Sequence, residues 1–254
     1  MVQNHLLQVL CIVAMEAPYS ISADAVRDEK MKVLNSLRPL SSKAVNEFVV
    51  RGQYGEGAIE GSPVASDREE LGAVSRTETF VALKAYIDNW RWAGVPFYMR
   101  TGKRLKRRPS EIDIVYRDIP HSAFPMDSGH IKPNRLIIRL QPDAGIGLQL
   151  MTKVPGPGGI RLREAPLDLS FEDEFQTRYP DSYERLLLDV VRGDSTLFMR
   201  RDEVEAAWRW VTPILETWAA SDKAPKGYTA GSWGPSASAT LVDRDGHSWH
   251  EEMG

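Results

Sequence analysis

Residues 77–103, TETFVALKAYIDNWRWAGVPFYMRTGK, decide the fold of this chain. Two parts of the stretch, 77–89 and 95–103, are rich in β-branched and aromatic residues, which favours strands. The residues between them, RWAGVP, are typical of a turn. Because one strand follows the other with only a turn between them, we expect an antiparallel arrangement.

Four further runs of the same kind lie on either side of this stretch. They are 47–55, 110–118, 134–142 and 145–153. Most of them alternate, as Ile112, Ile114 and Tyr116 do on one face, which is the period of a half-buried strand. Strands in succession with no helix between most of them predict a large, mainly antiparallel sheet.

Helices are expected near both ends of the chain. Residues 4–16 are apolar on almost every face, which indicates a buried helix, and residues 23–37 predict a more charged helix that begins after Ser22. Two later segments, 181–194 and 200–221, also have apolar residues at helical spacing. Helices, then strands, then helices predict an α+β fold in one domain.

The apolar face expected for the helix at 181–194 includes Tyr183, Leu187 and Val190. The residues after Lys226 are rich in Gly, Ser and Ala, which is typical of a loosely ordered segment.

Bulk composition excludes several classes of protein. The chain has 254 residues, a net charge of −3 and a single cysteine, Cys11, so a disulfide framework is excluded and no strong attraction to nucleic acid or anionic lipid is expected. The apolar run 6–15 is too short for a bilayer, which takes about 20 residues, and it lacks the flanks of a signal peptide. We expect a cytoplasmic protein without a membrane or nucleic-acid partner.

No motif for a metal or a dinucleotide stands out. The five histidines are scattered, and the only cysteine has no second cysteine to pair with in a metal site. No glycine-rich loop lies between a strand and a helix, so the residues alone predict no dinucleotide site of the usual kind.

The densest group of charges is the segment 100–111, RTGKRLKRRPSE. Six basic residues fall within nine positions: Arg100, Lys103, Arg104, Lys106, Arg107 and Arg108. One interpretation is a solvated turn or a weak polyanion patch. The other is a clamp for a phosphate or an anionic sugar, since phosphate favours several charged donors that converge from one loop. The pattern leaves both open.

His5 is the second candidate for chemistry. A lone histidine near a helix start is more often structural. However, the positive partial charge at a helix N-terminus disfavours the imidazolium form, so a neutral imidazole would be available as a base. No acidic residue lies near His5 in the sequence to orient its ring.

Several segments, taken in order, resemble glucose-6-phosphate dehydrogenase, specifically its C-terminal domain. They are MVQNHLLQVLCIVAMEAP, VRDEKMKVL, RGQY, the stretch 77–103, NRLIIRLQP, PDSYERLLLDV and GSWGP. The resemblance implies a domain at 1–235, with a loosely ordered tail at 236–254. It also implies a large, mainly antiparallel sheet with helices packed on one side, and a homodimer formed through that sheet.

The resemblance also implies roles for three residues. The family oxidises glucose 6-phosphate with NADP to the 6-phosphogluconolactone, the first step of the oxidative pentose phosphate pathway. The histidine of its Gln-Asn-His-Leu-Leu motif is the base, and it falls on His5. Its contacts to the sugar oxygens and to the phosphate fall on Lys103 and Arg108.

The resemblance leaves out the family's nucleotide-binding half. Met1 matches an internal position of the longer enzymes, so the glycine-rich loop that binds NADP and the Asp-His-Tyr motif that orients the base have no counterpart here. We therefore expect little or no turnover from this chain alone. Two alternatives are a non-catalytic module that dimerises or binds sugar phosphates, and a half-enzyme that is completed by a separately encoded nucleotide-binding chain.

Some members of the family bind a second, structural NADP on this domain. The residues that fall on parts of that site are Arg100, Arg139, Lys153 and Asp168. Gly147 and Gln149 replace an aromatic and a basic residue there, and Pro109 replaces another basic residue. We expect no tight structural NADP site.

Overall fold

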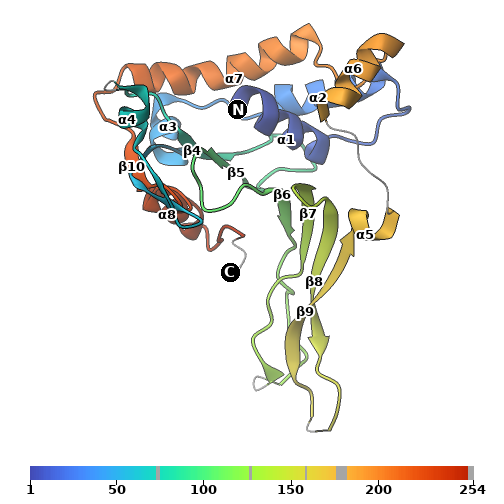
Figure 1. The fold of residues 1–254 in the computed structure, drawn as a ribbon. Helices are drawn as coiled ribbons and strands as arrows, with labels where there is room; N and C mark the ends of the chain where they lie inside the picture. The colour runs from blue at the N-terminus through green and yellow to red at the C-terminus, as the bar shows by residue number, and fades with distance from the viewer. Residues whose placement is uncertain (73–74, 126–127, 158, 176–181, 251–254) are drawn as a thin grey trace. The chain divides into compact units, whose positions relative to one another are not determined.

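The computed structural model describes residues 1–72, 75–125, 128–157, 159–175 and 182–250. The chain divides into two compact units. Unit 1 comprises residues 1–106 with 181–251, and unit 2 comprises residues 107–180 with 252–254. Each unit contains a four-stranded sheet of its own (Figure 1).

Unit 1 combines helices from both ends of the chain with the strands between them. Its N-terminal helices are the π-helix η1 (Val2–Leu6), α1 (Leu7–Ala14), α2 (Ala23–Ser36), α3 (Ser42–Phe48) and α4 (Asp67–Leu71). Its strands are β1 (Val49–Gly55), β2 (Gly57–Ile59), β3 (Ser62–Val64), β4 (Phe80–Ala85), β5 (Phe97–Gly102) and β10 (Lys226–Thr229). Its C-terminal helices are α6 (Ser182–Arg192), α7 (Arg201–Ala219) and α8 (Ser236–Asp243).

The sheet of unit 1 has the strand order β10-β1-β4-β5. The pairs β1–β4 and β4–β5 are antiparallel, whereas β1 and β10 are parallel and join Gly52 to Lys226. All six residues of the central strand β4 are buried. Because alternate residues of a strand point to opposite faces, both faces of this strand need a cover.

The two faces of the β4 strand belong to two different apolar cores. Val81 and Leu83 lie in a core built with residues of α1, α2, α3 and α7. Phe80 and Ala82 lie in a second core, to which α8 contributes Leu241. The helices of unit 1 therefore cover both faces of its sheet (Figure 1).

Unit 2 is built on four antiparallel strands in sequential order. They are β6 (Ser110–Val115), β7 (Arg135–Gln141), β8 (Gly145–Lys153) and β9 (Leu162–Ser170), and the short helix α5 (Phe171–Phe175) follows them. The register pairs Leu136 with Leu148, and Leu148 with Leu167. One face of this sheet is therefore apolar, while the other carries the ion pairs Arg135–Asp113 and Arg139–Asp168.

The α+β class, the mainly antiparallel pairing and all six predicted strands are confirmed. Two details differ. The strands form two four-stranded sheets and one two-stranded ladder instead of one large sheet, because the backbone that follows β5 bonds to residues 231 and 232 and does not continue the ladder. The helices lie on both faces of the unit 1 sheet instead of one, because Phe80 and Ala82 require the cover that α8 provides.

The segment 236–254, predicted as a loosely ordered tail, contains helix α8 in its described part. Leu241 and Val242 are buried, and the Trp249 indole donates a hydrogen bond to the Ser238 carbonyl at 2.9 Å. The many small residues of this segment concealed its two buried apolar residues, Leu241 and Val242. The domain boundary at residue 235 stays a prediction, and the chain divides by its internal contacts into two compact units.

The predicted apolar face of the segment 181–194 is exposed within the described residues. Helix α6 forms as expected, but the exposed fractions of Tyr183, Leu187 and Val190 are 77%, 66% and 61%. The predicted helix at 4–16 begins earlier, as η1, and it ends at Ala14. No helix in the described residues is long and apolar enough to cross a membrane.

Candidate functional site

His5 lies near the first residue of the chain, on the π-helix η1. Its side chain is exposed, and within the described residues no group forms a hydrogen bond or ion pair with it. Short π-helical segments are rare and occur frequently at functional sites. Because the side chain is exposed, the imidazole is accessible, and no carboxylate in the described residues orients its ring.

The helix that follows His5 is fixed by a buried polar network. Lys30 on α2 donates to the Gln8 side-chain oxygen on α1 at 2.8 Å, and its ammonium lies 3.1 Å from Glu203 Oε1 on α7. Glu203 is fully buried, and its other oxygen accepts a hydrogen bond from the Arg200 amide at 3.0 Å. Three helices are thus joined by side chains that must stay paired, since an unpaired buried charge is costly.

Cys11 lies on the same helix, close to this network. The pKa of its thiol is raised to about 12, mainly by burial. The thiol therefore stays protonated at neutral pH, and a protonated thiol is neither a nucleophile nor a metal ligand.

The far end of α1 is fixed by the turn that the opening stretch of sequence predicted. The Trp92 indole donates a hydrogen bond to the Ala14 carbonyl at 2.8 Å. Its ring packs edge-on against Phe97, with ring centroids 5.2 Å apart. The turn between β4 and β5 therefore holds the C-terminal end of the helix that η1 precedes.

Lys103 directly follows β5, and its backbone is held from two sides. Its amide donates to the Thr79 carbonyl at 2.8 Å, and its carbonyl accepts from the Tyr228 hydroxyl at 2.6 Å. Its side chain is exposed. A fixed backbone with a free ammonium suits a residue that binds a ligand from solution, because less freedom is lost on binding.

The GSWGP loop, residues 231–235, holds the rest of the basic segment. The Gly231 amide donates to the Arg104 carbonyl at 2.8 Å, and the Lys106 amide donates to the Ser232 carbonyl at 2.9 Å. Gly231 has φ +85°, and a Cβ there would lie 2.0 Å from the Ala58 carbonyl oxygen. Only glycine fits this position without displacing the backbone.

The six basic residues of this segment have different surroundings. Arg104 pairs with Glu70 at 2.8 Å, and Glu70 also accepts from the Tyr54 hydroxyl at 2.7 Å. Burial, with the bond to Glu70, raises the pKa of Tyr54 to about 12, and that bond in turn lowers the pKa of Glu70. Arg100 lies between two indoles, 5.0 Å from the Trp233 centroid and 4.6 Å from that of Trp249.

The exposed basic side chains include Lys103 in unit 1 and Arg108 at the start of unit 2. His5 and Lys103 belong to one compact unit. Sequence reasoning gave no role to Tyr228 or Glu70. Neither residue carried a local signal, because each acts on the basic segment from a distant part of the chain.

Two residues suggested for a second NADP site bind each other. Arg139 donates to the Asp168 carboxylate from both terminal nitrogens, at 2.5 and 3.0 Å. Among the described residues, no group of His, Cys, Asp and Glu could hold a metal ion.

Comparison with known proteins assigns this architecture to a class and then to a family. The α+β fold is that of a domain of dehydrogenases, and a family model described as "Glucose-6-phosphate dehydrogenase, C-terminal domain" matches residues 1–250. The chain belongs to the glucose-6-phosphate dehydrogenase family, as its C-terminal domain.

Curated relatives match the chain along its whole length. Glucose-6-phosphate 1-dehydrogenase of Rhizobium meliloti (strain 1021) is 60% identical over 254 residues, which is 100% of this chain and 52% of the relative. The enzyme of Mycolicibacterium smegmatis is 56% identical over 98% of this chain and 50% of the relative. The chain thus spans about half the length of the relatives it matches.

Solved structures match the fold closely. The crystal structure of glucose-6-phosphate 1-dehydrogenase from Mycobacterium avium superposes with a TM-score of 0.79 at 36% identity, over 99% of this chain and 50% of the other. A glucose-6-phosphate dehydrogenase in complex with its substrate glucose-6-phosphate superposes with a TM-score of 0.85 at 34% identity, over 98% of this chain and 50% of the other.

Proposed function

We propose that this chain is the substrate-binding half of an NADP-dependent glucose-6-phosphate dehydrogenase, which catalyses the first step of the oxidative pentose phosphate pathway. The observation that carries the proposal is the likeness, over 98% of the chain, to a dehydrogenase in complex with glucose-6-phosphate. NADP accepts the hydride when it is bound. The family binds it on a glycine-rich strand–turn–helix, and no element of that glycine-rich kind is among the described ones.

In this proposal the chain's own residues bind the sugar phosphate and move one proton. The His5 imidazole takes the proton of the C1 hydroxyl while the C1 hydrogen leaves as hydride, and C1 becomes the carbonyl carbon of the lactone. Lys103 holds sugar oxygens, and Arg108 binds the phosphate through charge-assisted hydrogen bonds. The exposure of all three side chains supports these roles.

Binding of glucose 6-phosphate tests this assignment on the chain as it exists. By titration calorimetry we expect Lys103→Ala and Arg108→Ala each to weaken binding about tenfold, the usual effect of losing a hydrogen bond to a charged group. Lys106→Ala is the matched control, since Lys106 is an exposed base of the same segment, and it should stay within about twofold of the parent chain. Equal losses in all three variants would instead indicate an unspecific basic loop.

The second candidate function is that of a non-catalytic module that dimerises. The enzyme half is expected to dimerise too, so both candidates share the homodimer. We propose that the chain forms a homodimer through the apolar face of the unit 2 sheet. On that face the exposed fractions of Leu167 and Leu169 are 59% and 41%, next to Leu148 on the neighbouring strand. A contiguous apolar face of this kind is typical of an interface.

The dimer is tested by sedimentation velocity on the double variant Leu167→Glu/Leu169→Glu. Placing two carboxylates in a dry interface should shift the chain from dimer to monomer at micromolar concentration. Lys153→Glu, on the opposite face of the same sheet, should leave the dimer intact. A dimer that survives the double variant places the interface elsewhere, and a dimer without glucose 6-phosphate binding favours the assembly module over the enzyme half.

The same proposal includes a cytoplasmic location for the protein. A single buried cysteine supports a reducing cytoplasm. A separately encoded nucleotide-binding chain is the alternative that the sequence raised, and mixing such a chain with this one in an assay of NADPH formation tests that arrangement.

A further inference from the structure

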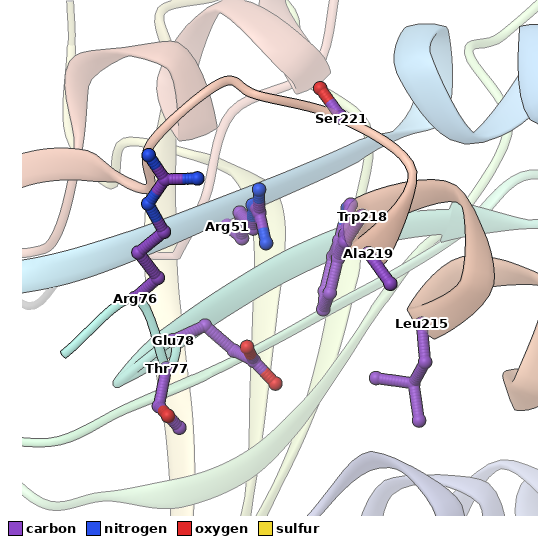
Figure 2. Close-up of a pocket in the computed structure, with 8 residues that line it drawn as sticks. All are labelled: Arg51, Arg76, Thr77, Glu78, Leu215, Trp218, Ala219 and Ser221. Atoms are coloured by element: carbon purple, nitrogen blue, oxygen red, sulfur yellow. The ribbon is translucent and has the colours of Figure 1, made fainter.

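A cavity of about 350 Å³ that is widely open to solvent lies in unit 1, and its lining includes neither the basic segment nor His5. It is formed by Arg51 of β1, by the segment 76–78 ahead of β4, and by residues at the C-terminal end of α7 (Figure 2). Its volume falls within the range of small-molecule sites. No role proposed above uses any of its lining residues.

Arg51 is held in place at the wall of this cavity. One terminal nitrogen donates to the Lys223 carbonyl at 2.5 Å, and the guanidinium carbon lies 5.3 Å from the centroid of the Trp218 ring. Within the described residues, no carboxylate pairs with it. A guanidinium that is already positioned, with donors left over, can bind an anion with little loss of freedom.

Arg76 and Glu78 line the same hollow without forming an ion pair in the described part of the chain. Their backbone is fixed, because the buried Gln53 amide donates to the carbonyls of Ser75 and Thr77, both at 3.1 Å. The cavity is therefore lined by two cations and one anion, and no ion pair between these three side chains neutralises their charges in the described residues. A ligand that offers an anion to the arginines and hydrogen-bond donors to the carboxylate would satisfy all three.

The remaining wall favours a ligand with both polar and apolar surfaces. Trp218 and Leu215 supply apolar contact, and Ser221 supplies a hydroxyl. A hydroxyl oxygen can accept a hydrogen bond from a ligand, as the Glu78 carboxylate can. We propose that this cavity binds a small phosphate ester that carries hydroxyl groups, with the phosphate on Arg51 and Arg76 and the hydroxyls on Glu78 and Ser221.

The test follows the indole N–H signals of the whole chain by NMR during a titration with glycerol 2-phosphate. The Trp218 signal, assigned by its loss in Trp218→Phe, should shift and saturate, whereas neutral glucose should leave it unchanged. Arg76→Ala should weaken the binding at least tenfold. Arg91→Ala is the control, because Arg91 is an exposed arginine of the same unit that lies 5.5 Å from the Trp92 ring and pairs with Glu16, and its loss should change nothing at Trp218.

The variant Glu78→Gln distinguishes two cases: a site in which the carboxylate takes part in binding, and two surface arginines that bind any anion. Without the carboxylate, inorganic phosphate should bind more tightly, while the preference for glycerol 2-phosphate over inorganic phosphate should fall severalfold. An unchanged signal of the buried Trp210, whose indole bonds to the Arg38 carbonyl, reports that each variant is folded. The proposal is overturned if Trp218 does not respond, if Arg76→Ala binds as the parent does, or if Glu78→Gln leaves the preference unchanged.

Discussion

Replacing Glu203 by alanine is expected to lower the free energy of unfolding by about 3–5 kcal/mol, the usual cost of removing one partner from a buried ion pair. The variant leaves the Lys30 ammonium buried and without its carboxylate, and it removes the acceptor of the Arg200 amide. Urea unfolding followed by circular dichroism measures the loss. Glu203→Gln, which keeps the volume but not the charge, should change stability in the same direction.

Glu205→Ala is the matched control for this prediction. Glu205 lies on the same helix and pairs with Arg201, but both side chains are mostly exposed, so we expect a loss below about 1 kcal/mol. The triple variant Gln8→Leu/Lys30→Met/Glu203→Leu should recover most of the lost stability, since an apolar replacement leaves no charge unpaired. Equal stability of Glu203→Ala and Glu205→Ala would contradict the network described here.

Replacing His5 by asparagine is expected to lower kcat about 10²–10⁴-fold, the contribution of a positioned general base. Because this chain alone is expected to show little turnover, the measurement uses a chimera in which it replaces the matching half of the 60%-identical Rhizobium meliloti enzyme. NADPH formation is followed at saturating NADP. The KM for glucose 6-phosphate should stay within a few-fold, since the imidazole is needed for the proton transfer more than for binding.

His130→Asn in the same chimera serves as the control. His130 is an exposed histidine of unit 2, so the same exchange there should leave both kinetic constants unchanged. A kcat for His5→Asn within tenfold of the parent chimera would remove His5 from the proposed role. A loss confined to KM would reassign it from proton transfer to binding.

Strand positions could be predicted because their apolar residues recur with period two over several residues. The strands that were missed carry a weaker signal. In the edge strand β9, LREAPLDLS, Pro166 and several charges interrupt the pattern, while β2, β3 and β10 have only three or four residues each. Edge strands tolerate such residues because one side of their backbone needs no partner.

The predicted site depends on motif resemblance, and its physical support could not be predicted from local sequence. Lys30 and Glu203 are 173 positions apart, and Lys103 receives its bond from Tyr228 across 125 positions. Charge pattern identified the basic segment but not which members are already engaged. Arg104 turned out to be paired with Glu70, a residue of a short helix that was not predicted.

The parallel pairing of β1 with β10 has a consequence for how the chain reaches this structure. The pair joins Gly52 to Lys226, so this edge of β1 stays bare during synthesis until the 174 positions that follow Gly52 have left the ribosome. Contacts of such high sequence separation slow folding, because a long loop must close before they form. During synthesis, β1 therefore presents unpaired backbone groups until β10 emerges, and such an edge is open to pairing with another chain.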